Sequence, residues 1–130
     1  MLQKYKAILS NTKMKSVTGY LFKKNKLCFI LNDNVEYIVN EKTIGQSTGL
    51  FDKNGKEIFI NDIIHFKADY GSYTLELQTA TVGFDELNGR LAVKMNGNVL
   101  ALCDMNYTNV EYEVLGNIWT GDVKVHGKKV

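Results

Sequence analysis

Residues 44–66 read IGQSTGLFDKNGKEIFINDIIHF. Near the middle of this stretch stands Asn54-Gly55, a pair of residues that tolerate positive φ and are typical of tight hairpin turns. The segments KEIFI and DIIHF, which follow the turn, are rich in the β-branched and aromatic residues that strands favour. The stretch therefore predicts short antiparallel strands, with a hairpin closed over Asp52 to Lys56.

The same pattern continues toward the C-terminus. Asn88-Gly89 and Asn96-Gly97 are two more Asn-Gly pairs, each close to strand-like sequence. Proline is absent from the chain, so the turns depend on Asn and Gly. Residues 72–79, SYTLELQT, alternate apolar and polar side chains, which predicts a strand with one buried face.

Two further segments are predicted strands with special features. Residues 109–119, NVEYEVLGNIW, alternate as far as Gly116, which predicts a β-bulge or a close backbone approach. Residues 27–31, LCFIL, are apolar throughout, which predicts either a strand covered on both faces or an association surface. The preceding residues place a turn at 23–26, so that a hairpin presents lysines at its tip.

Helical periodicity is weak, and only short pieces around residues 10–16 and 104–109 are compatible with helix. We predict a mainly β fold: a compact barrel or sandwich of about eight short antiparallel strands with little helix. With 45% hydrophobic and 23% charged residues, a chain of 130 residues is expected to form one globular domain. Its expected parts are an N-terminal hairpin region (1–43), a barrel-like core (44–119) and a tail (120–130).

The chain carries no apolar run near the roughly 20 residues of a membrane helix. Its N-terminal residues MLQKYKAILSNTKMK lack the pattern of a signal peptide. We therefore expect a cytoplasmic protein that does not associate with membranes. Cys28 and Cys103 lie in apolar contexts and are expected to be small buried hydrophobic residues rather than disulfide partners.

Charge is distributed unevenly along the chain. Residues 1–26 hold seven Lys and no acid, whereas residues 27–123 carry fourteen Asp and Glu against five Lys and one Arg, a sum of −8. The basic end can attract nucleic acid or an acidic partner, or its lysines can protect a sheet edge from pairing. Because base readout depends heavily on Arg and Arg90 is the only one, sequence-specific DNA binding is disfavoured.

Residue types that serve catalysis or metal binding are few. His65 lies in a strand-like segment and His126 in the polar tail, and the two cysteines give no spacing typical of metal ligands. Four acids are interpreted as a candidate acidic surface: Asp85, Glu86, Glu111 and Glu113. We expect no enzymatic activity, no metal site and no cofactor.

Two segments resemble the signature of the YopX-like family of phage and prophage proteins. Residues 44–66 match the family pattern Q-x-T-G-L-x-D-x-N-G-K-E-I-[YF]-x-x-D-I-[VI] at Gln46, Thr48, Gly49, Leu50, Asp52, Asn54, Gly55, Lys56, Glu57, Ile58, Phe59, Asp62 and Ile63. The segment YEVLGNIW is similar to the family's YEVIGNIY, with matches at Tyr112, Glu113, Val114, Gly116, Asn117 and Ile118. The resemblance implies a phage-encoded accessory protein with a β-barrel-like C-terminal portion, and it implies no particular biochemical activity.

The chain departs from the family pattern at both ends, and Asn61 stands where the family has Gly before Asp62. Asparagine also tolerates turn conformations, so this change is modest. We interpret the motif as a device for folding, in which Thr48-Gly49 makes a turn. The alternative interpretation is an acidic functional site formed by three carboxylates: Asp52, Glu57 and Asp62.

Three functions are compatible with these features. The first is a non-enzymatic phage or prophage accessory protein that binds and modulates a bacterial host factor. An anti-CRISPR would be one such protein, and its acidic body could occupy the basic channel of a host protein that handles nucleic acids. The second is a nucleic-acid-binding β-barrel with a lysine-rich N-terminal hairpin, and the third is a self-assembling homo-oligomer that pairs through residues 27–31. The candidate residues for binding a partner or nucleic acid are Lys13, Lys15, Tyr20, Phe22, Lys23, Lys24 and Lys26.

Overall fold

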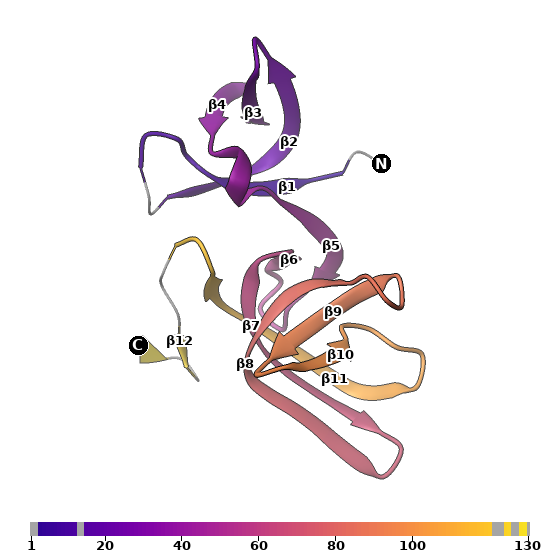
Figure 1. The fold of residues 1–130 in the computed structure, drawn as a ribbon. Helices are drawn as coiled ribbons and strands as arrows, with labels where there is room; N and C mark the ends of the chain where they lie inside the picture. The colour runs from indigo at the N-terminus through magenta and orange to yellow at the C-terminus, as the bar shows by residue number, and fades with distance from the viewer. Residues whose placement is uncertain (1–2, 13–14, 121–123, 126–127, 130) are drawn as a thin grey trace.

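The computed structural model of the chain describes residues 3–12, 15–120, 124–125 and 128–129. Among the residues that the structure describes, 67% are in strands and 3% in helix, which confirms the mainly β prediction. Figure 1 shows two parts, an upper one formed by the first third of the sequence and a lower one formed by most of the remainder. The two sheets are sandwich-like and neither closes into a barrel.

The upper sheet is six-stranded and antiparallel, and its last two strands reach down toward the lower part (Figure 1). Its order is β4 (Val35–Val39), β3 (Leu27–Asn32), β2 (Ser16–Lys24), β1 (Tyr5–Ile8), β5 (Gly45–Phe51) and β6 (Glu57–Phe59). The motif in residues 44–66 thus begins in this sheet, where β5 pairs with β1 on one side and with β6 on the other. The hairpin predicted over Asp52 to Lys56 is confirmed as the connection between β5 and β6.

The lower part is a five-stranded antiparallel sheet. Its order is β10 (Asn98–Ala101), β9 (Arg90–Met95), β8 (Tyr73–Asp85), β7 (Asp62–Tyr70) and β11 (Tyr107–Asn117). A short pair, β12 (Lys124–Val125) and β13 (Lys128–Lys129), completes the thirteen strands of the described residues. This number exceeds the eight or so expected, because turns with positive φ also form without an Asn-Gly signal, as at Asn25-Lys26, Asp33-Asn34 and Gly71.

The three Asn-Gly pairs lie between antiparallel strands, as predicted, but only Asn96-Gly97 is a two-residue turn. These two residues have φ of 49° and 84° and join β9 directly to β10. At the other two pairs only the glycine has a positive φ. The loops are longer there because an Asp side chain at the start of each loop accepts backbone N–H groups: Asp52 from Asn54 and Lys56, and Asp85 from Leu87 and Asn88.

Helix within the described residues is limited to the 3-10 turn η1 (Glu41–Thr43). The expectation of short helices is wrong for the described parts of 10–16 and for 104–109, where turns lead into strands. Asp104 explains the second case, because its side chain accepts Asn106 N–H and its carbonyl accepts Tyr107 N–H, which closes a turn before β11.

The buried apolar residues form two clusters, since alternate residues of a strand point to one face, and Ile58 of β6 links the six-stranded sheet to the larger cluster. The upper cluster contains Ala7, Cys28, Ile30 and Val39. The lower and larger cluster contains Ile58, Ile64, Phe66, Ala68, Leu77, Ala80, Val82, Val93 and Leu102. Cys28 is buried as expected, but the expectation is wrong for Cys103, which is exposed because Leu102 takes the buried position after β10.

The upper sheet bends sharply within β2, as Figure 1 shows. The strand changes partner there: Gly19 pairs with Tyr5 of β1, and the next residue, Tyr20, pairs with Leu31 of β3. A Cβ on Gly19 would lie 2.2 Å from the Leu31 carbonyl oxygen, so the corner requires glycine. The bend brings β4 back toward the end of β1, where Leu9 and Val39 form a bridge.

The lower sheet is drawn together by tyrosine side chains of β11. The Tyr107 hydroxyl donates to the carbonyl of Ala101 at 2.8 Å, and the Tyr112 hydroxyl donates to the carbonyl of Leu102 at 2.7 Å. These bonds connect the end of β10 with β11, although the two strands are opposite edges of the sheet. The bulge predicted near Gly116 is confirmed by a register shift between Val114 and Gly116.

The two sheets meet at the start of β5. A Cβ added to Gly45 would lie 2.1 Å from the carbonyl oxygen of Ile60, in the turn between β6 and β7. In that turn Asn61 has φ of 83°, and its N–H donates to the Val82 carbonyl of β8. The glycine therefore lets the first strand of the motif lie directly against the turn that opens the lower sheet.

We predict that Gly45→Ala lowers the free energy of unfolding by about 2 kcal/mol or more, because the backbone oxygen it meets cannot move aside freely. Gly83→Ala is the matched control, since the added Cβ would meet only the flexible end of Lys94 at 3.4 Å. Urea unfolding of both variants measures the difference. Equal stability of the two variants would contradict the proposed contact.

We also predict that stability falls as the pH rises from about 10 to about 12. Burial raises the pKa of the Tyr112 hydroxyl from 10.0 to about 12. Between these values the unfolded chain releases a proton that the folded protein retains, so the free energy of unfolding decreases with pH. Tyr112→Phe should flatten this decline in urea titrations, whereas Tyr73→Phe, at a side chain that is 72% exposed, should not. An identical decline in all three proteins would show that Tyr112 is not responsible.

Candidate interaction surface

The lysine-rich hairpin predicted at residues 23–26 is present, with Asn25-Lys26 as its turn between β2 and β3. Two of its lysines are paired with carboxylates: Lys23 Nζ lies 3.0 Å from Glu41, and Lys24 Nζ lies 3.2 Å from Glu36. The hydrogen bond from Lys23 lowers the pKa of the Glu41 carboxyl.

The remaining candidate lysines differ in position. Lys15 and Lys26 are exposed, and Lys13 lies outside the described residues. The hairpin tip therefore presents less uncompensated positive charge than the count of lysines indicates.

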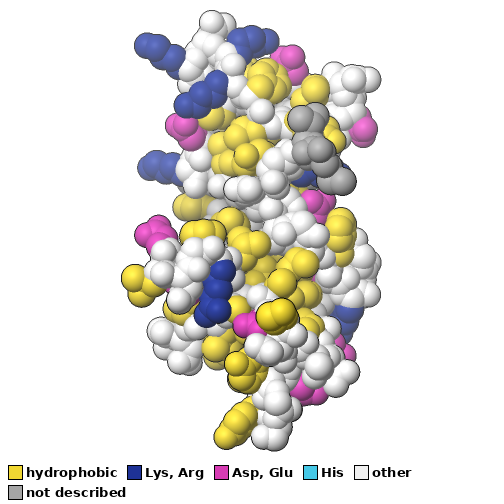
Figure 2. All heavy atoms as spheres, turned by 90° about the vertical axis from the view of Figure 1, so that its right-hand side faces the viewer, with side chains coloured by type: hydrophobic (Ala, Val, Ile, Leu, Met, Phe, Trp, Pro, Cys, Tyr) yellow, Lys and Arg dark blue, Asp and Glu magenta, His cyan; other side chains and the backbone are white. Residues whose placement is uncertain are grey.

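Tyr20 and Phe22 lie on one face of the upper sheet, which we call the outer face. Because paired residues of antiparallel strands share a face, the register places six further side chains there: Lys24, Leu27, Phe29, Leu31, Glu36 and Ile38. Phe22 and Phe29 stack at 5.2 Å between ring centroids. Figure 2 shows hydrophobic side chains at the surface of both halves of the molecule, with Lys or Arg side chains projecting at the edge of the upper half.

Much of the outer face remains open to solvent. Tyr20 is 40% exposed, Leu27 47% and Ile38 42%. The expectation of a strand covered on both faces is wrong for residues 27–31, since Cys28 and Ile30 belong to the core while the other side contributes to an exposed apolar face. An association surface stays a prediction.

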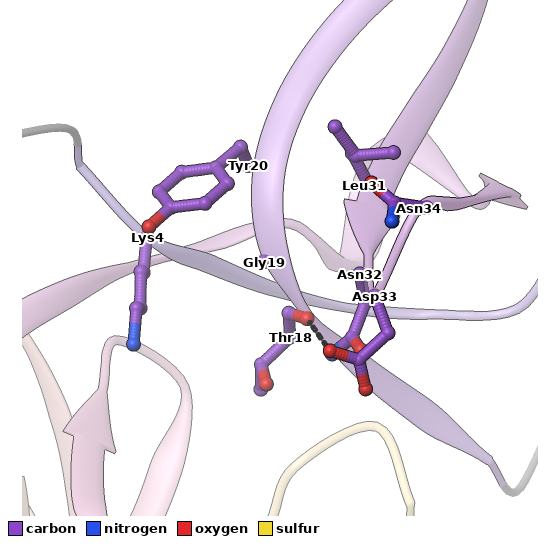
Figure 3. A pocket seen from close by; sticks show the side chains of 8 residues that line it. All are labelled: Lys4, Thr18, Gly19, Tyr20, Leu31, Asn32, Asp33 and Asn34. Atoms are coloured by element: carbon purple, nitrogen blue, oxygen red, sulfur yellow. Dashed lines mark hydrogen bonds between the residues drawn. The ribbon is translucent and has the colours of Figure 1, made fainter.

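Two hollows flank Tyr20. The first, of about 400 Å³, is lined by Lys4, Thr18, Gly19, Tyr20, Leu31, Asn32, Asp33 and Asn34. Figure 3 shows Tyr20 and Lys4 on one side of it and Thr18, Asn32 and Asp33 on the other. The amide of Asn32 donates to the Thr18 carbonyl at 2.6 Å, which holds the far side together.

The second hollow, here called the β5 hollow, has a volume of about 670 Å³. Its lining comes from the N-terminal residues, β2, and the β5–β6 hairpin: Gln3, Lys4, Tyr20, Ser47, Thr48, Gly49, Phe51 and Glu57. The turn expected at Thr48-Gly49 is wrong, because these residues lie within β5, where the register with β6 shifts. Gly49 has φ of 78° at this irregularity, and the site is consequently open beside it.

Glu57 supplies the carboxylate of the β5 hollow. Its side chain is 20% exposed, and its Oε2 accepts a hydrogen bond from the Ser47 hydroxyl at 2.5 Å. Its Oε1 lies 4.0 Å from Lys4 Nζ, the outer limit of an ion pair. Sequence reasoning did not identify Gln3, Lys4 or Phe51 as members of this site, because nothing in the local sequence indicates that the N-terminal residues lie beside β5.

Asp62 occupies a buried position between the two sheets. The side chain is fully buried, and its Oδ1 lies 2.9 Å from Nζ of Lys6 in β1. The same oxygen accepts the amide of Asn117 in β11 at 2.9 Å, and Oδ2 accepts the Phe59 N–H at 2.8 Å. Asp62 therefore connects β1, the β6–β7 turn and β11.

Asp52 likewise connects elements, joining the β5–β6 loop to β11. Besides the bonds within its loop, its Oδ2 accepts the Val114 N–H of β11 at 2.9 Å. The alternative of one acidic site formed with Glu57 gains no support from this arrangement, since both oxygens of Asp52 and of Asp62 are engaged in structural hydrogen bonds. Among the described residues no three His, Cys, Asp or Glu side chains are grouped so that they could hold a metal ion.

The four acids of the candidate acidic surface fall into two separate places. Asp85 and Glu86 lie at the turn between β8 and β9, where Asp85 pairs with Arg90 at 3.6 Å. Glu111 and Glu113 lie on β11, which is separated from β8 by β7, and Glu113 pairs with Lys53 at 3.5 Å. They do not form one continuous acidic patch.

The remaining candidates are placed as follows. His65 lies on the polar side of β7, and its Nε2 is 2.7 Å from Glu76, which places it on a strand face as expected. His126 lies outside the described residues. In the described part of the chain no helix is both long enough and apolar enough to cross a lipid bilayer.

Comparison with known proteins gives one match. A family model described as YopX protein matches residues 1–121. The match extends beyond the two motifs recognised in the sequence and includes the lysine-rich N-terminal strands. No curated protein matches the chain.

We predict that Asp62→Asn lowers the free energy of unfolding by about 3–5 kcal/mol, because it leaves the buried Lys6 ammonium without its counter-charge. The double variant Lys6→Met/Asp62→Asn should lose less than the sum of the single losses, since neither charge then remains alone. Asp69→Asn is the control, as its carboxylate accepts hydrogen bonds at the exposed edge. Additive losses in urea titrations would contradict a direct Lys6–Asp62 interaction.

Proposed function

The chain belongs to the YopX protein family, and from this premise we propose that it is a non-enzymatic phage accessory protein that binds and modulates a protein of the bacterial host. The proposal places its action in the host cytoplasm. It rests chiefly on one observation, the exposed apolar outer face of β2, β3 and β4. An apolar face of this kind, bordered by charged residues, is typical of a protein–protein interface.

A protein partner suits the outer face better than nucleic acid does. Lys24 lies over the Phe29 ring at 5.3 Å and also pairs with Glu36, so its charge is compensated within the protein. Phe22 and Phe29 stack on each other, which leaves their faces less available for nucleotide bases. Binding of single-stranded nucleic acid favours uncompensated cations beside free aromatic faces.

The sharper form of the proposal concerns the nature of the partner. Residues 52–119 contain ten Asp and Glu against four Lys and one Arg, a net charge of −5. A negative half of the molecule is attracted to a basic surface, such as the channel of a nucleic-acid-handling host protein. An inhibitor of a host defence system, for example an anti-CRISPR, is one such protein.

The test is a pull-down from host cells with the purified chain, followed by binding measurements on the retained protein. Ile38→Glu, which places a charge on the outer face, should weaken binding by about tenfold or more. Val99→Glu is the matched control: Val99 is exposed to a similar extent, 45% against 42%, but lies on β10 of the other sheet. Equal binding by Ile38→Glu and the unaltered protein, or the absence of any retained protein, would overturn the proposal.

The same samples distinguish the two other hypotheses. Binding to single-stranded DNA that falls steeply with salt and is lost when Lys23, Lys24 and Lys26 become Glu would support a nucleic-acid-binding protein. A mass above that of one chain in light scattering, reduced to one chain by Ile38→Glu, would support self-assembly. Either result without a host partner would replace the proposal.

A further inference from the structure

We propose that the β5 hollow binds an arginine side chain of the partner protein and so anchors the interface. The inference rests on the proposed function, because it names the chemistry of the partner group. It is derived from three features of the hollow: a carboxylate with acceptor capacity to spare, two exposed aromatic rings, and a volume of about 670 Å³.

The carboxylate is that of Glu57. The Ser47 hydroxyl occupies Oε2, whereas Oε1 has Lys4 Nζ at 4.0 Å, too far for a hydrogen bond. A carboxylate can accept about four hydrogen bonds, so Oε1 retains capacity on the side of the hollow. The neighbouring Gln3 uses its amide nitrogen on the Lys4 and Ser47 carbonyls, which leaves its amide oxygen as a second acceptor.

The aromatic rings are those of Tyr20 and Phe51. Tyr20 is 40% exposed and Phe51 56% exposed, and both line the hollow from different strands, β2 and β5. A guanidinium group stacks favourably on exposed aromatic faces while its N–H groups bond to acceptors in its plane. The combination of ring faces and carboxylate thus suits a planar cation.

Other ligands fit less well. An anion would be repelled by Glu57, and an apolar group would remove water from the carboxylate without replacing its hydrogen bonds. Lys4 already provides an ammonium, but its side chain is 49% exposed and its distance from Glu57 shows that it does not occupy the site closely. Guanidinium has five donors in a fixed fork, so it can satisfy the Glu57 and Gln3 oxygens together.

An arginine anchor agrees with the proposed class of partner. Proteins that handle nucleic acids expose arginines that contact phosphates. A partner arginine held in the β5 hollow could no longer contact phosphates. The outer face and the β5 hollow share Tyr20, so both can belong to one interface.

The test uses the full chain and a small probe, N-acetyl-arginine methylamide, in a titration followed by backbone NMR shifts. The neutral isostere N-acetyl-citrulline methylamide is the control probe. We expect shifts at Gly49 and Phe51 with arginine and at least tenfold weaker binding with citrulline, because the charge-assisted bonds are lost. Equal binding of the two probes, or no shifts at these residues, would overturn the inference.

Variants separate the site from general effects on charge. Glu57→Gln should weaken arginine binding by about tenfold, whereas Glu36→Gln, which removes an exposed carboxylate paired with Lys24, should leave it unchanged. If Glu57→Gln does not fold, Phe51→Ala provides a second test at an exposed ring, with an expected loss of about threefold to tenfold. Unchanged binding in a folded variant of either residue contradicts the inference.

The outcome for the anchor is distinct from that for the proposed function. If Glu57→Gln binds the host protein as tightly as the unaltered chain does, the arginine anchor is contradicted but the proposed function is not. If arginine binds in the hollow but no host protein is retained, the arginine site is supported and the proposed function is contradicted.

Discussion

The buried ion pair between Lys6 and Asp62 is the interaction on which the arrangement of the two sheets depends. Apolar contact between the two sheets comes from β5 and β6, where Leu50 and Ile58 pack in the larger cluster, whereas the smaller cluster belongs to the six-stranded sheet alone. Asp62 connects strands of both sheets through Lys6, Asn117 and the Phe59 N–H. Because a buried carboxylate is costly without partners, the pairing of Asp62 favours the placement that keeps these three groups together.

This placement produces the candidate interaction surface. With the N-terminal residues held beside β5, Lys4 approaches Glu57, and Tyr20 comes to lie at the border of two hollows. The family motif therefore has two roles in the structure. Asp52 and Asp62 stabilise the fold, whereas Glu57 faces a hollow to which the N-terminal part of the chain contributes one wall.

Ion pairs in the folded protein reduce the positive charge that the sequence suggests for the N-terminal region. The sequence concentrates lysines near the N-terminus, but Glu36 and Glu41 lie beside Lys24 and Lys23 and compensate them. What remains exposed on the outer face is largely apolar. For this reason we favour a protein partner over nucleic acid. We propose the β5 hollow as the place where a cation of that partner binds.

The sequence by itself determined the local features: the strand alternation, the chain reversals at the Asn-Gly pairs, the bulge near Gly116 and the mainly β class. These depend on neighbours in the chain, through positive φ and the two-residue period of a strand. Only the tertiary structure decided that Asp62 is buried against Lys6, that Cys103 is exposed, and that the hollow combines Gln3 with Glu57. The physical reason is that ion pairs, burial and hollows depend on distances between residues far apart in the sequence, about which local patterns carry no information.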